Sequence, residues 1–217
     1  MRSIVESNYK RFCALEGSDY IASEYALEII VEIIDNFEVS TVLELGMGIG
    51  CITDTVLRYA HNKNLNITYF GTEANNYCIK ALQNNVKNYS YLHHSLSLDQ
   101  ISLNRKFDLI IVDGQDPCLE NLNQRCESNS IIFIEGDRKP QTSLLLSIFP
   151  NAIHVNLISL SKNKSYAHGI CKESDYVGGG QLIFTNPSFK MRYFWLKNKI
   201  GTHLKRRIRK LKTNEKS

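Results

Sequence analysis

Val42-Leu-Glu-Leu-Gly-Met-Gly-Ile-Gly50 is the stretch of this chain that decides its fold. Together with Thr41, its mainly apolar beginning predicts a short buried strand at 41–45, and three alternate glycines follow this strand. Glycines at such a turn let the backbone bend sharply and approach a ligand where any Cβ would clash. A helix expected at 52–61 brings its free N–H groups to the same place. We therefore predict a ligand-binding loop between a strand and a helix, with a tight turn that binds nothing as the alternative.

Strand and helix patterns alternate along the rest of the chain. Short apolar runs predict further strands at 67–71, 91–95, 107–112, 131–134, 152–160 and 181–185. Helices are predicted at 22–37, 75–87, 117–127 and 141–148, whereas residues 1–19 show no clear period. Such alternation implies an α/β fold, with a mainly parallel sheet covered by helices on both faces. The carboxyl ends of the strands then share one edge, where ligands bind.

The glycine spacing narrows the class of ligand. A dinucleotide fingerprint requires a third glycine three residues after Gly48, where this chain has Cys51. The G-K-[ST] of a phosphate-binding P-loop is absent. Glu44 lies within the strand, and Glu73 follows the next strand, 23 residues beyond Gly50. An acid about 20 residues past the glycines is the expected partner of a ribose.

The pattern G-x-G-x-G after a strand that carries an acid resembles motif I of class I S-adenosylmethionine-dependent methyltransferases, and the chain is similar to their small O-methyltransferases. The resemblance covers about Tyr20 to Pro187. It implies a Rossmann-like α/β fold with seven strands, the last of them antiparallel. It places the methyltransferase domain at 1–187, with an entry segment and helix at 1–37. The resemblance implies cofactor contacts from Glu44, Gly46, Met47, Gly48, Gly50, Glu73, Ala74, Ser95, Leu96 and Asp113.

Asp113 ends the strand 107–112 and is expected to face the cleft, with a helix cap as the alternative. Family members that methylate amino groups usually carry Asn/Asp-Pro-Pro-aromatic here. This chain has Asp-Gly-Gln, which favours an oxygen acceptor. Cys118 follows a proline, as in RNA cytosine-5 methyltransferases, but their Thr-Cys companion is missing. We therefore interpret Cys118 as structural.

Two further acids, Glu135 and Asp137, follow the strand 131–134 and are expected beside Asp113. Converging carboxylates repel one another unless a cation intervenes. Divalent O-methyltransferases of the catechol and macrolide-sugar kinds carry acids at these places, so the resemblance allows Mg²⁺ held by Asp113, Glu135 and Asp137. The alternative is that Arg138 pairs with Asp137 or Glu135.

Asp113, His94 and Asp137 are the candidate catalytic residues. His94 could act as a general base, because the ordinary pKa of histidine lies near neutrality. A structural role for His94 is the alternative, and His168 is a second histidine candidate.

The segment Ser18–Tyr25 resembles the entry segment that closes over the cofactor in related O-methyltransferases. Ser23 and Glu24 could then contact cofactor or substrate. The polar linker 161–180 could shape the acceptor pocket.

The C-terminal segment 188–217 is strongly basic. Residues 190–217 carry eleven Lys/Arg and one acid, for a net charge of +10, whereas residues 1–189 carry −6. An apolar stripe recurs at steps of three and four residues along a predicted helix, at Tyr193, Leu196, Ile200, Leu204, Ile208 and Leu211. Such a helix could lie on an anionic membrane, pack its stripe on the domain, or bind nucleic acid phosphates.

Composition and cysteine usage indicate the class of protein and its compartment. With 43% hydrophobic and 22% charged residues, the chain is of ordinary globular composition. Its six cysteines show no CxxC spacing, and its first residues lack the basic-then-apolar pattern of a signal peptide. We expect reduced thiols and a cytoplasmic protein, peripheral on the inner face of a membrane if the basic segment binds lipid.

The sequence thus predicts an S-adenosylmethionine-dependent O-methyltransferase acting on a small molecule or a sugar. An RNA methyltransferase that binds phosphates through its basic segment is the first alternative. The second is a module that binds S-adenosylmethionine without catalysis. The sequence predicts no oligomeric state.

Overall fold

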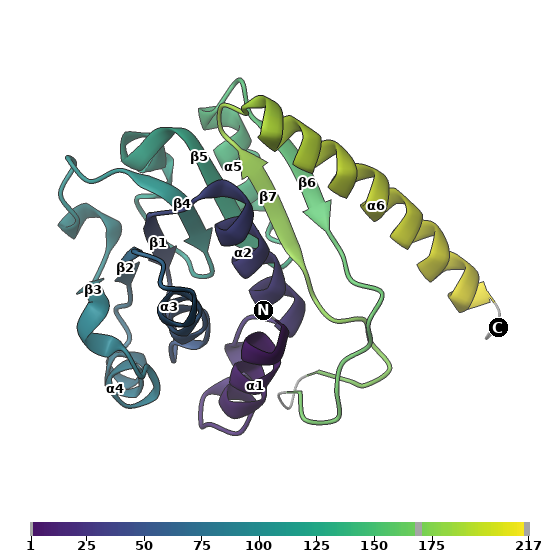
Figure 1. Cartoon of the computed structure of the whole chain (residues 1–217), viewed down its shortest axis with the longest axis horizontal. Helices are drawn as coiled ribbons and strands as arrows, with labels where there is room; N and C mark the ends of the chain where they lie inside the picture. The colour runs from purple at the N-terminus through teal and green to yellow at the C-terminus, as the bar shows by residue number, and fades with distance from the viewer. Residues whose placement is uncertain (1, 168–170, 215–217) are drawn as a thin grey trace.

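A computed structural model of the chain describes residues 2–167 and 171–214, and it shows one seven-stranded sheet with helices on both faces (Figure 1). The strand order is β3-β2-β1-β4-β5-β7-β6. β7 runs antiparallel to β5 and β6, and the other neighbouring strands pair in parallel. The strands are β1 (Thr41–Leu45), β2 (Thr68–Thr72), β3 (Leu92–Ser95), β4 (Phe107–Val112), β5 (Cys126–Glu135), β6 (Ile153–Leu157) and β7 (Gly180–Phe184).

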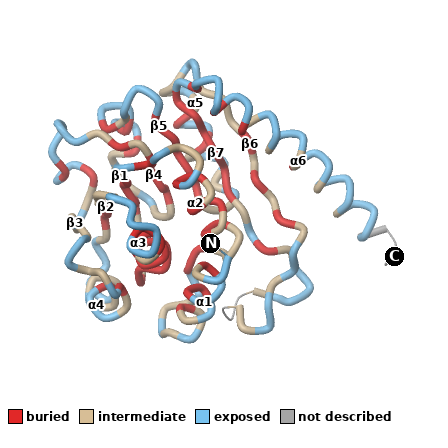
Figure 2. Tube along the Cα trace, viewed as in Figure 1, coloured by how far each residue is buried: buried red, intermediate tan, exposed pale blue. Residues whose placement is uncertain are grey.

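The helices form two apolar cores, one on each face of the sheet. One core includes residues of α1 (Arg2–Cys13), α2 (Glu24–Phe37), α3 (Cys51–Lys63), α4 (Asn76–Asn85) and the start of α6 (Phe189–Asn214). The other core joins α5 (Lys139–Ile148) to the short helices η3 (Leu98–Gln100) and η4 (Leu119–Arg125). The remaining short helices are η1 (Ser18–Tyr20) and η2 (Tyr89–Tyr91). β4 is buried along nearly its whole length, as expected of a central parallel strand (Figure 2).

The predicted α/β fold and the antiparallel last strand are confirmed, and β1 and β4 have their predicted bounds. The segment between β4 and β5 differs from the prediction. The helix predicted at 117–127 is a short 3₁₀ helix, η4, and β5 already begins at Cys126. Residues 127–129 are exposed and polar, so they carry none of the apolar signal from which the strand was predicted.

Helix α1 was not predicted from the sequence. Its inner face consists of Val5, Asn8, Tyr9 and Phe12, which are all buried. The spacing is helical, but a polar residue fills one of the inner positions and weakens the apolar period.

Buried polar groups join α1 to α3. The Asp54 carboxylate, whose side chain is fully buried, pairs with Arg11 at 2.5 Å and with Arg58 at 3.7 Å, and it accepts a hydrogen bond from the Lys87 backbone N–H at 2.8 Å. Asn8 donates to the Thr55 hydroxyl at 2.8 Å. These contacts hold the segment 14–22, which follows α1, over the loop after β1. At Gly17, where φ is +84°, a Cβ would lie 2.9 Å from the Ile49 side chain.

Helix α6 packs along β6 through a face that the sequence did not indicate. Met191, Phe194 and Thr202 are buried, and the Thr202 hydroxyl donates to the Asn156 carbonyl at 2.6 Å. The Trp195 indole donates to the His154 carbonyl at 2.8 Å. The interpretation in which the predicted apolar stripe packs on the domain is wrong, because that stripe is exposed. No helix within the described residues is long and apolar enough to cross a membrane.

We predict that Asp54→Ala lowers the free energy of unfolding by about 3 kcal/mol, because removing one partner of a buried ion pair leaves the other charge uncompensated. Chemical denaturation with circular dichroism measures the change. Arg2→Ala is the control, since the Arg2–Glu28 pair lies at 3.8 Å with Arg2 88% exposed; its effect should stay within about 0.5 kcal/mol. Equal effects of the two substitutions would contradict this account.

Candidate functional site

The loop after β1 is built by three glycines in the left-handed backbone region, where L side chains are strained. Their φ angles are +86° at Gly46, +53° at Gly48 and +96° at Gly50. The backbone N–H groups of Gly46 and Met47 donate to the Thr72 carbonyl at 3.1 and 3.0 Å. The loop is therefore fixed to the carboxyl end of β2.

Gly46 and Gly114 bring the ends of β1 and β4 into backbone contact. A Cβ at Gly46 would lie 2.5 Å from the Gly114 Cα, and a Cβ at Gly114 would lie 2.9 Å from the Gly46 Cα. The N–H groups of Asp113 and Gly114 both donate to the Leu45 carbonyl, at 2.9 and 2.7 Å. Gly114 is thus required for packing against Gly46. Its presence in Asp-Gly-Gln is therefore weaker evidence that the methyl acceptor is an oxygen atom.

Gly48 differs from Gly46 because a Cβ there would meet nothing within 4 Å. It faces a cavity of about 250 Å³ between the loop and the segment 17–22. The lining includes Met47 and Ile49 from the loop, Tyr20 and Ile21 from the entry segment, Tyr77 from α4, and Asp113. Part of the segment Ser18–Tyr25 thus lines the same cavity as the glycine loop, and the prediction that the segment closes over a cofactor stays a prediction. Tyr77 was not singled out from the sequence, because its role depends on where α4 packs.

Glu73 lies beside this cavity, at the end of β2. Its carboxylate accepts a hydrogen bond from the Gly48 N–H at 2.7 Å and another from the Asn75 N–H at 2.8 Å. A carboxylate in this position can accept hydrogen bonds from ribose hydroxyls. Ala74, next to it, is exposed.

Glu44 is fully buried within β1 and is not one of the residues that line the cavity. One carboxylate oxygen accepts hydrogen bonds from Thr53 at 2.6 Å and from Tyr69 at 2.5 Å. Burial raises the pKa of Glu44 to about 7, although the two hydrogen bonds act in the opposite direction and lower it. Its other oxygen, Oε1, is buried with no hydrogen-bond partner among the described residues. Glu44 thus keeps one acceptor free for a water molecule or a ligand donor.

A second cavity, of about 560 Å³, adjoins the first and shares Tyr20, Ile21 and Asp113 with it. Glu135 and Tyr176 also line it, the latter from the linker 161–180. The linker thus lines a pocket next to the cavity beside the glycine loop, and its part in an acceptor pocket stays a prediction.

Asp113 lies between the two cavities, with its side chain only 12% exposed. Arg138 pairs with its carboxylate at 3.2 Å. Burial and the nearby Glu135 carboxylate raise the pKa of Asp113, while Arg138 acts in the opposite direction. Burial also raises the pKa of Glu135. Two carboxylates with raised pKa values therefore face the second cavity, and Arg138 lies beside both.

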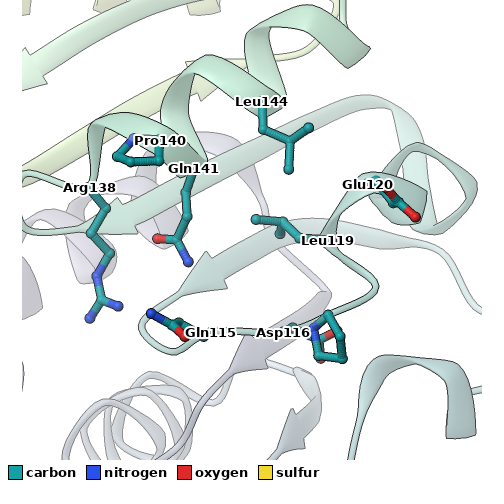
Figure 3. Close-up of a pocket in the computed structure, with 9 residues that line it drawn as sticks. Gln115, Asp116, Leu119, Glu120, Arg138, Pro140, Gln141 and Leu144 are labelled. Atoms are coloured by element: carbon teal, nitrogen blue, oxygen red, sulfur yellow. The ribbon is translucent and has the colours of Figure 1, made fainter.

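A third cleft, of about 740 Å³, lies between η4 and α5 (Figure 3). Leu119 and Leu144 face each other across it, and Arg138 reaches its other end (Figure 3). The Gln141 amide donates to the Gly114 carbonyl at 2.8 Å. Arg138 therefore lines both this cleft and the second cavity.

The predicted metal ligands do not converge. Asp137 has a side chain that is 68% exposed and lies 3.9 Å from Lys139, while Asp113 pairs with Arg138. Within residues 2–167 and 171–214, no group of three or more His, Cys, Asp or Glu side chains is placed to hold a metal ion. The donor set Asp113, Glu135 and Asp137 thus does not fit Mg²⁺, because a cationic guanidinium occupies the position that a metal ion would need. The exposure of Asp137 also removes the basis for its catalytic role.

The other predicted site residues of this region, His94, Ser95 and Leu96, lie outside the lining of the two cavities. The His94 ring nitrogen lies 2.9 Å from the Glu73 carbonyl, and His94 lines neither cavity, which favours its structural interpretation. Ser95 accepts a hydrogen bond from the Glu73 N–H at its carbonyl, and Leu96 is 49% exposed. Both lie near Glu73, outside the lining of the first cavity. His168 falls outside the described residues.

Ser23 and Glu24 separate in the structure. Ser23 caps α2 by accepting a hydrogen bond from the Ala26 N–H at 3.2 Å, donates to the Gly178 carbonyl at 3.0 Å, and lines the second cavity. Glu24 instead lines a separate pocket with Arg2 and Lys164. The Cys118 N–H donates to Asp116 at 2.8 Å, and Cys118 lines none of the three cavities.

Comparison with known proteins gives matches of structure alone. No family model matches the chain, and no curated protein matches it by sequence. Among solved structures, an O-methyltransferase from Bacillus cereus in complex with SAH aligns with a TM-score of 0.59 and 12% identity, over 85% of this chain and 91% of that one.

Two further structures align comparably. The O-methyltransferase TomG from Streptomyces achromogenes, involved in tomaymycin synthesis and solved with SAM, has a TM-score of 0.58 at 10% identity, covering 85% of this chain and 90% of that one. A precorrin-6y C5,15-methyltransferase from Geobacter metallireducens has a TM-score of 0.57 at 13% identity, covering 78% and 92%. The chain therefore has the class I methyltransferase fold.

Proposed function

We propose that this chain transfers a methyl group from S-adenosylmethionine to a hydroxyl oxygen of a small molecule or a sugar. The observation that carries the proposal is the open space at Gly48. There the loop and the entry segment line a cavity, a Cβ added at Gly48 would meet no atom within 4 Å, and the Glu73 carboxylate accepts a hydrogen bond from the Gly48 N–H. The fold, shared with methyltransferases solved with SAM or SAH, supports the choice of ligand.

The residues around the first cavity fit this cofactor. The backbone of 46–50 would hold its methionine part, and the Glu73 carboxylate would accept hydrogen bonds from the ribose hydroxyls. Glu44 Oε1 retains a free acceptor beneath the loop for an ammonium donor, directly or through water. S-adenosylmethionine, when bound, supplies an electrophilic methyl group on a sulfonium.

The second cavity is where we place the acceptor. A volume of about 560 Å³ suits a small molecule or a sugar residue. An acceptor hydroxyl beside Asp113 would give its proton to that carboxylate as the C–O bond forms, while the C–S bond breaks and sulfur takes the electron pair. A carboxylate with a raised pKa is a stronger base near neutral pH. The chain would otherwise act by orienting the two reactants in adjoining cavities.

We predict that Gly48→Ala abolishes S-adenosylmethionine binding in calorimetry, because its methyl group occupies the cofactor cavity. Gly136→Ala is the matched control, since Gly136 also has a positive φ, +73°, and open space for a Cβ. Both substitutions should cost about 1–2 kcal/mol of stability through backbone strain, but only the first should lose binding. Wild-type protein should bind S-adenosylmethionine and not NAD.

Binding of NAD alone by the wild-type protein would overturn the proposal, and so would full binding by Gly48→Ala. Binding of S-adenosylmethionine with no transfer of labelled methyl groups to a panel of phenols, catechols and sugars would instead favour a binding module. Transfer to RNA alone would favour an RNA methyltransferase.

We predict that Glu135→Gln lowers the pKa of Asp113, because removing a nearby negative charge favours the charged form of the remaining carboxylate. Carboxyl NMR titration of protein labelled at aspartate measures this pKa, and Asp113→Asn assigns the signal. Glu127→Gln, at the opposite, exposed end of the same strand, should leave it unchanged. An unchanged Asp113 titration in Glu135→Gln would show that the two carboxylates are not coupled.

A further inference from the structure

We propose that the outward face of α6 docks on the surface of an anionic lipid bilayer. This face consists of the apolar stripe Phe189, Tyr193, Leu196, Ile200, Leu204, Ile208 and Leu211, and the basic residues beside it. The proposal concerns a surface away from the two cavities, so it stands independently of the proposed reaction.

The stripe is exposed along the full length of α6. Tyr193, Ile200 and Leu211 are 68%, 54% and 65% exposed, and Phe189 at its start is 88% exposed. At 100° per residue, these positions lie on the side of the helix opposite Met191, Phe194 and Thr202, which pack on the domain. The inner face is thus fully used, and the outer stripe has no partner among the described residues. An exposed apolar patch of this extent marks an interaction surface.

The charges beside the stripe determine the kind of partner. Residues 189–214 contain ten Lys/Arg and no acid. Arg192, Lys199, Arg206 and Lys210 follow one border of the stripe at helical spacing, and all four are exposed. A helix with apolar side chains on one face and Lys/Arg along its border binds the interface of an anionic membrane, where the side chains enter the lipid and the cations meet the headgroups.

Two other partners fit the same face less well. A second copy of this chain would place Lys/Arg of one α6 against Lys/Arg of the other, with no acid in this helix to compensate. RNA would be bound through phosphates and by stacking on aromatic rings. In this stripe only Phe189 and Tyr193, at one end, carry aromatic rings, and the other five residues are aliphatic.

The surroundings of α6 also suit a lipid surface. A groove of about 640 Å³ lies between β6 and α6, lined by Val155 and Ile200 together with Lys199 and Arg206. Apolar and cationic side chains around one groove match an acyl chain beneath an anionic headgroup. At 1.5 Å per residue, the stripe from Phe189 to Leu211 offers a contact about 33 Å long.

The far end of α6 reaches the loop that lines the second cavity. The Arg209 guanidinium lies 4.1 Å from the centre of the Tyr176 ring and donates to the Ser159 carbonyl at 2.9 Å. Tyr176 lines the second cavity with Asp113 and Glu135. Docking through α6 would therefore place this cavity close to the lipid surface.

Flotation of the full chain with vesicles tests the proposal. We expect binding to vesicles of phosphatidylglycerol and phosphatidylcholine in equal parts, and none to phosphatidylcholine alone. The triple variant Lys199→Gln/Arg206→Gln/Lys210→Gln should bind about 100-fold more weakly, since each Lys or Arg near an anionic surface contributes about fivefold. The triple variant Leu196→Ser/Ile200→Ser/Leu204→Ser should lose at least about tenfold, because it removes the apolar contact.

Each variant has a matched control elsewhere on the surface. Lys63→Gln/Lys80→Gln/Lys87→Gln removes three exposed charges, and Leu65→Ser/Tyr91→Ser/Leu103→Ser removes three exposed apolar side chains. Both controls should float like wild type. Circular dichroism confirms that every variant is folded.

Three outcomes would overturn the proposal. The first is failure of the wild-type chain to float with anionic vesicles. The second is flotation of the serine variant at wild-type strength, which would leave charge as the only determinant. The third is a competing partner: light scattering that shows a dimer which the serine variant dissociates, or RNA binding that the glutamine variant loses and the serine variant keeps.

Discussion

The backbone contact between Gly46 and Gly114 is the constraint on which the rest of the site depends. It requires two residues without a Cβ at the ends of neighbouring strands, and the shared hydrogen bonds to the Leu45 carbonyl hold the strands in that register. The next positions then have fixed directions: Gly48 opens toward a cavity, and Asp113 lies between that cavity and its neighbour. The two cavities adjoin because Asp113, which follows β4, lines both of them together with Tyr20 and Ile21.

A second set of contacts positions the segment that lies over the glycine loop. The buried Asp54 carboxylate ties α1 to α3, and α1 leads into the segment with Tyr20 and Ile21 that covers the loop. Buried charges of this kind hold elements in one arrangement only when their partners are present. The cover over the glycine loop thus depends on electrostatics as well as on apolar packing.

The sequence predicted what local patterns encode. The strand 41–45, the glycine loop and Glu73 follow from periodicity and spacing, and the structure places them together. It did not predict features that arise only from tertiary contact. Helix α1 was missed because Asn8 interrupts its apolar face, and the packing role of Gly114 is invisible without Gly46 beside it. Three acids at one sheet edge suggested a metal site, but Arg138 pairs with Asp113 and Asp137 turns outward. The stripe on α6 was visible, whereas the direction it faces was not.

The central claim is that the loop after β1 holds S-adenosylmethionine. A crystal structure of the chain with S-adenosylhomocysteine tests it most directly. The account predicts the ligand in the cavity beside Gly48, with its ribose hydroxyls within hydrogen-bond distance of the Glu73 carboxylate and its sulfur facing Asp113. A ligand bound elsewhere, with the cavity beside Gly48 empty and no ribose hydroxyl on the Glu73 carboxylate, would contradict the claim.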